Sequence, residues 1–388
     1  MALRQTNRFE RDKLTLDKRR KPASNRLFHY YARYLAHASG VTDAVDHWLD
    51  ASKRIDPHAQ ILSAGVLGID ADADRVKTIS HLGRDRRSWL PIGLIGRLRR
   101  GDILVIHEGW VLSNLAAALI TRMSGAHYVV MPHGVYEQGI VSNQRDRFGL
   151  RHQAERLVIR HAAAVHVFYP GEQAVVRRME PKVRHFITLP NGAPDSSPSW
   201  RGSGDFFLYL GRFDPFHKGL DNLLQFWSRL PTPRPHLKLV GPDFQDGKRV
   251  VGALIRELGL TESVSIERHA SGQRKAQLLA QARAYIHPSR WESCSITLLE
   301  MLSAGVPALV SSTIHASVEL EQVDVFRIVD FENPDVNAES IIACVDTNAD
   351  LGRRAARWVA KEGNWASIEK RFVVEYSQLS ETLRGAGK

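Results

Sequence analysis

The chain has 388 residues, which at roughly 150 residues per domain predicts two to three domains. Hydrophobic residues make up 43% and charged residues 24%, and no apolar run reaches the length of about 18 residues that spans a membrane. The net charge of +11 favours anionic partners, while two cysteines exclude a disulfide framework or a zinc site and predict a reducing, cytoplasmic setting.

The N-terminal segment is strongly basic. Residues 1–26 carry nine Lys or Arg residues against three acidic ones. They lack the apolar core of a signal peptide. We therefore predict a basic tail that is either solvated or held electrostatically on anionic lipid at the inner face of a membrane.

Apolar runs typical of buried strands alternate with helical patterns through the first half of the chain. The predicted strands and helices, in chain order, are residues 103–106 (strand), 110–123 (helix), 128–131 (strand), 151–161 (helix), 163–168 (strand) and 187–189 (strand). This order predicts a parallel sheet covered by helices. Residues 191–205 are rich in Pro, Ser, Gly and Asp, which indicates an interdomain segment.

The same alternation resumes after this segment. The predicted strands are 206–210, 237–240, 264–266, 284–286 and 307–311, and the predicted helices are 220–230, 250–258, 274–281, 297–303, 338–345, 351–362 and 367–383. We expect two doubly wound, Rossmann-like α/β domains, with boundaries at 27–195 and 196–366. Ligands of such sheets bind beyond the carboxyl ends of the strands, so two facing domains would enclose a binding cleft.

Residues 286–310 contain the most informative cluster. Glu292 lies in the turn after a predicted strand, and Glu300 lies in the second turn of the following helix. The free N–H groups of that helix suit a phosphate, and the carboxylate of Glu300 suits the two hydroxyls of a ribose. Ser293 and Ser295 either cap the helix or line the pocket. The alternative is a capped helix with two solvated glutamates.

A second cluster follows the strand of residues 206–210. Gly211 permits a sharp turn, and Arg212 and Lys218 place two cations where they can clamp a diphosphate. Ordinary surface cations are the alternative. Asp214 and His217 lie between them and are interpreted as polar loop residues.

The first half of the chain adds three weaker candidates. His133 follows a predicted strand and faces the expected cleft, where it would hydrogen-bond a sugar hydroxyl, orient an acceptor or serve as a structural group. His107 follows the preceding strand and has the same interpretations. Gly40 precedes a helical pattern, and its backbone is placed to approach a phosphate.

Several motifs are missing. No P-loop, no dinucleotide-binding G-x-G-x-x-G after a strand and no G-x-S-x-G elbow occur, which argues against ATP hydrolysis, hydride transfer and serine hydrolysis. Asp70, Asp72 and Asp74 form a polar turn that we interpret as solvated, so we expect no metal site. No nucleic-acid-binding motif accompanies the basic charge, so we expect no nucleic-acid partner.

Together, these clusters resemble glycosyltransferase family 4. The resemblance rests on GRFDPFHKG after a strand, on two glutamates with seven residues between them, and on AGVPALV. The first half is similar through MPHGVYEQG and LPNGAPD. The family implies a GT-B fold, in which two Rossmann-like domains face each other across a cleft and a final helix, here 367–388, packs back on the first domain.

The resemblance also implies roles for residues. Arg212 and Lys218 would bind the donor diphosphate, Glu300 the ribose, and Glu292 the transferred sugar. His133 would contact that sugar near the reaction centre. The remaining donor-site positions implied by the resemblance are Gly40, Gly211, Ser293, Cys294, Ser295 and Ile296. The family often carries glycines where this chain has Ser293, Cys294 and Ser295, so we expect an altered sugar subsite.

The activity implied is a retaining transfer of a hexose-type sugar from a nucleotide-diphosphate sugar to a hydroxyl of a carbohydrate or lipid-linked acceptor. Such an enzyme would work in polysaccharide or glycolipid assembly without a cofactor or a metal. Two alternatives stay open: a nucleotide-sugar epimerase or hydrolase of the same fold, and a non-catalytic protein that binds anions or a membrane.

Overall fold

The computed structural model describes residues 25–36, 39–65, 72–83, 89–144, 149–194, 199–202, 204–333, 336–347 and 349–385. Of the predicted basic tail, residues 1–24 lie outside the described residues, as does Asp70.

The first domain is built on a seven-stranded sheet in which all pairings are parallel. Its strand order is β3-β2-β1-β4-β5-β6-β7. Every residue of β4 and β6 is buried, because helices cover both faces of the sheet. The strands are β1 (Leu27–Tyr30), β2 (Gln60–Ala64), β3 (Val76–Ile79), β4 (Ile103–His107), β5 (His127–Met131), β6 (Ala164–Val167) and β7 (Phe186–Thr188).

The helices of this domain include the three predicted from sequence, counting the helical pattern that follows Gly40. Their bounds are α1 (Gly40–Lys53), α2 (Leu112–Met123), α3 (Gln138–Val141), α4 (Leu150–His161) and α5 (Pro170–Met179), with short 3-10 turns at Tyr34–Ala36, Ile92–Leu94 and Ser142–Gln144. Sequence analysis did not predict β1, β2 or β3. Both central residues of β3 are exposed, so this strand lacks the apolar run that marks a buried one.

The second domain contains a six-stranded parallel sheet in the order β10-β9-β8-β11-β12-β13. Its strands are β8 (Phe206–Leu210), β9 (His236–Val240), β10 (Val264–Glu267), β11 (Ala282–His287), β12 (Ala308–Ser311) and β13 (Arg327–Val329). Its helices are α6 (Leu220–Ser228), α7 (Gly247–Glu257), α8 (Gly272–Gln281), α9 (Ile296–Ala304), α10 (His315–Leu320), α11 (Ala338–Thr347) and α12 (Ala349–Trp358), with a 3-10 turn at Glu321–Val323 and a π-helical turn at Val359–Gly363. Two Rossmann-like α/β domains are thereby confirmed.

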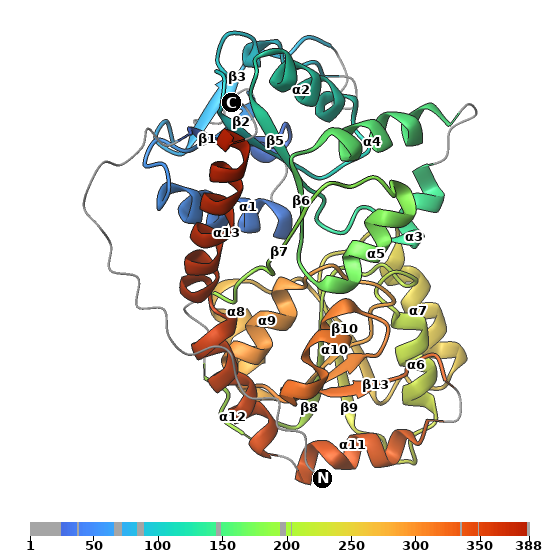
Figure 1. The fold of residues 1–388 in the computed structure, drawn as a ribbon. Coiled ribbons are helices and arrows are strands. Elements are labelled where there is room, and N and C mark those ends of the chain that lie inside the picture. The colour runs from blue at the N-terminus through green and yellow to red at the C-terminus, as the bar shows by residue number, and fades with distance from the viewer. Residues whose placement is uncertain are drawn as a thin grey trace, which may run out of the picture.

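The last helix, α13 (Trp365–Gly385), returns to the first domain and lies beside α1 (Figure 1). The ring of Trp365 packs edge-on against that of Trp48, with 5.0 Å between centroids. Gly192 lies against the start of α13, where an added Cβ would come within 2.5 Å of the Trp365 nitrogen. The chain therefore crosses between the domains twice at neighbouring places, which sets how the two sheets face each other.

Candidate active site

A cleft of about 800 Å³ lies between the two domains. Its walls come from the carboxyl ends of strands and the helix starts that follow them, where open α/β sheets bind ligands. The structure brings to this cleft all the site residues implied by the resemblance: Gly40, His133, Gly211, Arg212, Lys218, Glu292, Ser293, Cys294, Ser295, Ile296 and Glu300. His107, the other histidine candidate, is buried and contacts His133 without lining the cleft.

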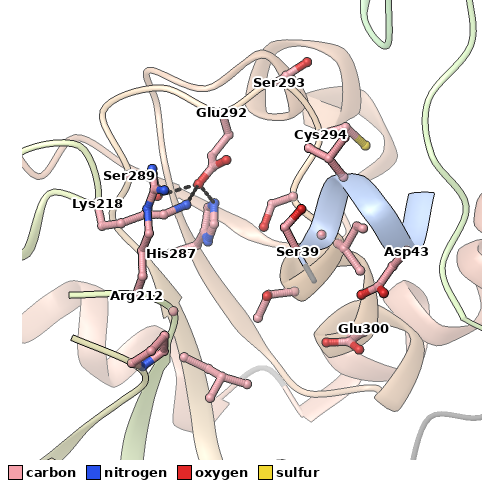
Figure 2. Close-up of a pocket in the computed structure, with 18 of the residues that line it drawn as sticks. Ser39, Asp43, Arg212, Lys218, His287, Ser289, Glu292, Ser293, Cys294 and Glu300 are labelled. Atoms are coloured by element: carbon pink, nitrogen blue, oxygen red, sulfur yellow. Dashed lines mark hydrogen bonds and ion pairs between the residues drawn. The ribbon is translucent and has the colours of Figure 1, made fainter. Parts of the chain in front are cut away.

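Glu292 is the centre of a buried polar cluster in this cleft (Figure 2). Its carboxylate forms an ion pair with Lys218, accepts a hydrogen bond from the Ser289 hydroxyl at 3.0 Å, and lies 3.8 Å from His287 Nε2. Burial opposes ionisation, but the charge of Lys218 overrides it and lowers the pKa of Glu292 to about 2. Glu292 is therefore a carboxylate at neutral pH and a hydrogen-bond acceptor.

Arg212 is held over the cleft by neighbours that leave its guanidinium open. Its side chain is 42% exposed, and its guanidinium lies 4.6 Å from the centre of the Phe244 ring. His217 donates from Nε2 to the Trp291 carbonyl at 3.1 Å, which leaves Nδ1 to accept from Arg212 Nη2 at 2.8 Å. His217, predicted as a loop residue, thus orients Arg212.

Glu300 lies in the part of the cleft nearest Asp43 (Figure 2). Lys275, on α8, reaches its carboxylate at 2.6 Å. A carboxylate has about four acceptor positions, so this ion pair leaves capacity for ligand hydroxyls. Sequence analysis missed Lys275, because no local motif connects it to a glutamate 25 residues away.

The N-terminus of α9 opens into the cleft. Ser295 is its N-cap, and its hydroxyl accepts a hydrogen bond from the Leu298 amide at 3.3 Å. Ser293 has a different role, because its hydroxyl donates a hydrogen bond to the Glu172 carboxylate of the first domain at 2.7 Å. Of the two alternatives for these serines, Ser295 caps the helix and Ser293 lines the pocket, with its hydroxyl engaged across the cleft.

Glu172, on α5, connects the two domains through this contact. Its Oε2 accepts the hydrogen bond from Ser293, and its Oε1 accepts hydrogen bonds from the amides of Phe168 and Tyr169, at 3.1 Å each. Burial raises the pKa of Glu172 to about 7. No sequence signal identified this residue, since its role depends on the packing of one domain against the other.

His133 follows β5 in a left-handed backbone conformation, with φ 52°. Gly134 comes next, also left-handed, and a Cβ there would lie 2.6 Å from the Ser293 Cβ. The turn therefore packs directly on the donor-side loop. Burial lowers the pKa of His133 to about 3, so its imidazole is neutral at physiological pH.

The described residues contain neither a metal-ligand cluster nor a membrane-spanning helix. Within them, no three His, Cys, Asp or Glu side chains cluster as metal ligands. None of the helices described is long and apolar enough to cross a membrane.

Two Rossmann-like domains that face each other across such a cleft define the GT-B class. Residues 24–192 match the family described as glycosyl transferase 4-like domain, and residues 196–360 match glycosyl transferases group 1. The chain therefore belongs to the GT4-type glycosyltransferases and is an enzyme.

Curated relatives agree with this assignment. The chain is 22% identical over 320 residues to GDP-mannose:cellobiosyl-diphosphopolyprenol alpha-mannosyltransferase of Xanthomonas campestris, covering 79% of this chain and 82% of the relative. It is 32% identical over 96 residues to the lipopolysaccharide glucosyltransferase WaaG of Escherichia coli, covering 24% and 25% of the two chains.

Solved structures share the fold. Sucrose-phosphate synthase of Thermosynechococcus elongatus superposes with a TM-score of 0.74 at 18% identity, over 92% of this chain and all of that chain (100%). HepE of Anabaena, in complex with UDP and glucose, superposes with a TM-score of 0.69 at 15% identity, over 91% and 100%.

Proposed function

We propose that this glycosyltransferase moves a hexose from a nucleotide-diphosphate sugar to an acceptor hydroxyl with retention of the anomeric configuration. One observation carries the proposal. Two cations, Arg212 and Lys218, converge with the open N-terminus of α9 and with Glu300 in one cleft. Cations and helix N–H groups bind a diphosphate, and a carboxylate at the far end suits a ribose.

The proposed reaction is a front-face displacement. The bond from the anomeric carbon to the phosphate oxygen breaks while the acceptor oxygen bonds to that carbon from the same face. Arg212, Lys218 and the start of α9 stabilise the negative charge that grows on the diphosphate. The acceptor proton passes to the leaving phosphate. Glu292, ionised and held by Lys218, binds sugar hydroxyls, so no carboxylate nucleophile of the glycosidase type is needed.

The donor is proposed from the relatives and from the sugar subsite. One relative is named for GDP-mannose, and the HepE structure holds UDP and glucose, so both purine and pyrimidine donors belong in the test. Ser293 and Cys294 line the subsite where the family often has glycine, and we expect them to select the sugar. The same relative is named for a diphosphopolyprenol acceptor, which supports a lipid-linked carbohydrate acceptor.

We also propose that one face of the first domain, formed by α2 and α4, contacts an anionic membrane. Leu112, Leu119 and Met123 form an exposed apolar stripe along α2, and the packed neighbour α4 adds exposed Leu150 and Leu157. An apolar pocket of about 390 Å³ lies at this face. The arginines on the same two helices are Arg122, Arg151, Arg156 and Arg160, of which Arg151 lines the pocket and Arg156 and Arg160 pair with Glu180.

Sedimentation with phosphatidylglycerol vesicles tests this contact. The variant L119E/M123E should stay in the supernatant, while wild type sediments. V374E is the matched control, because Val374 is equally exposed on α13, at 53% against 53% for Leu119. Equal sedimentation of all three proteins would reject this face as the contact.

A thermal-shift panel of nucleotide sugars tests the proposed donor, since a ligand of the folded state raises the melting temperature. Incubation of the best donor without acceptor then separates the alternatives. An epimerase or hydrolase consumes donor alone, whereas a transferase requires an acceptor. A panel without any shift would reject the donor site.

A further inference from the structure

A row of buried imidazoles leads from the cleft into the first domain. His133 Nε2 lies 2.8 Å from His107 Nδ1, His107 Nε2 lies 2.8 Å from His29 Nδ1, and His29 Nε2 lies 2.8 Å from the Ser52 hydroxyl. The adjacent rings are stacked, with 5.1 Å between the centroids of each pair. His29 and Ser52 are fully buried.

Strand register produces this row. The strands β1, β4 and β5 are parallel neighbours, in which His29 pairs with Val105 and His107 pairs with Met131. His107 therefore lies two residues beyond the residue that pairs with His29, and His133 lies two residues beyond the residue that pairs with His107. A step of two residues keeps the side chains on the same face of the sheet. The row steps towards the carboxyl edge and ends at the cleft, while α1 covers the face and supplies Ser52.

The row holds neutral rings. Burial, together with the neighbouring histidines, lowers the pKa of His29 and of His133 to about 3 and lowers that of His107. A neutral imidazole has one N–H and one bare nitrogen. Each contact in the row needs one proton, so all of the donors point in one direction, either towards Ser52 or towards the cleft.

Ser52 decides between these directions. Within the described part of the chain, His29 Nε2 is the one partner of its hydroxyl. If Ser52 accepted a proton from His29, its own buried O–H would have no acceptor, which is strongly unfavourable. Ser52 therefore donates to His29, His29 Nδ1–H donates to His107, and His107 Nδ1–H donates to His133 Nε2.

We infer that Ser52, His29 and His107 are positioning residues, which fix His133 as a hydrogen-bond donor to the cleft through its Nδ1–H. The inference rests on the proposed function, in which His133 contacts a hydroxyl oxygen of the transferred sugar. A donor nitrogen cannot take the acceptor's proton. His133 thus orients the sugar, and the proton passes to the leaving phosphate.

Nitrogen NMR of the full chain labelled with ¹⁵N-histidine tests the direction of the row. In wild type, long-range ¹H–¹⁵N correlations should show His133 protonated at Nδ1 and bare at Nε2. A wild-type His133 protonated at Nε2 would overturn the inference, and this measurement requires no variant.

Two serine variants test the role of Ser52. S52A removes the first donor, so we expect a mixed tautomer at His133 and a roughly ten-fold fall in kcat. S63A is the control, because Ser63 is equally buried in this domain and donates to the Ala32 carbonyl instead, at 3.3 Å. If S52A changed neither tautomer nor rate, the inference would be wrong.

The variant H133A separates this inference from the proposed function. Full transfer by H133A would reject the proposed sugar contact, while the wild-type tautomer would still decide the direction of the row. Loss of transfer in H133A, combined with an Nε2-protonated wild type, would overturn the inference alone.

Discussion

Removal of the Lys218 charge should destabilise the protein through Glu292. Both side chains of the pair are largely buried, with 17% and 14% exposed. The pKa of Glu292 falls from 4.5 to about 2 despite burial, and this difference corresponds to about 3 kcal/mol of net stabilisation of the carboxylate. K218M leaves that carboxylate buried and unpaired, so we expect a loss of about 3–5 kcal/mol in the free energy of unfolding.

The double variant K218M/E292Q gives the sharper test. Because it removes both charges, it should be more stable than K218M alone. Urea unfolding followed by tryptophan fluorescence measures the stability, and a transfer assay on the same samples should show losses of at least about 100-fold in K218M and in the double variant. E292Q alone completes the comparison: if the costs of K218M and of E292Q simply add in the double variant, the two residues are uncoupled and this reasoning is wrong.

Three further predictions follow from neighbouring contacts. E300Q should raise the donor KM about ten-fold with a smaller effect on kcat, because ribose binding persists into the transition state; an unchanged KM would contradict it. The raised pKa of Glu172 contributes stability that is present below pH 4.5 and lost as the pH rises through about 7, so the melting temperature of wild type should fall over this range relative to E172Q. G134A should cost about 1–3 kcal/mol more than G96A, measured by urea unfolding, because both glycines are left-handed but only Gly134 also meets Ser293.

Much of the fold was predictable because its central strands are unusually apolar. The strands β4 and β8 are wholly buried, and their apolar runs gave both their positions and the parallel order. In contrast, β1 is four residues long and includes a histidine, so its pattern was ambiguous. The predicted helix of residues 351–362 ends earlier, at Trp358, where a π-helical turn leads into α13.

The site was predictable where its residues follow strands, and unpredictable where they meet only in space. Arg212 and Glu292 could be placed because each comes shortly after a strand that ends at the cleft. Lys275 reaches the site from another helix, and Glu172 reaches it from the opposite domain. His29 acts on the site only through a buried row of side chains. Local sequence has no periodicity or motif for such contacts, since they depend on register and domain packing.

The central claim is that Arg212 and its neighbours bind the diphosphate of a nucleotide donor. Calorimetric titration of GDP and of UDP into wild type and R212M tests it most directly, with R249M as a control that removes an exposed arginine of α7 outside the cleft. We predict that at least one nucleotide binds wild type and R249M equally and binds R212M at least about ten-fold more weakly. Equal binding by R212M, or no binding of either nucleotide to wild type, would contradict the claim.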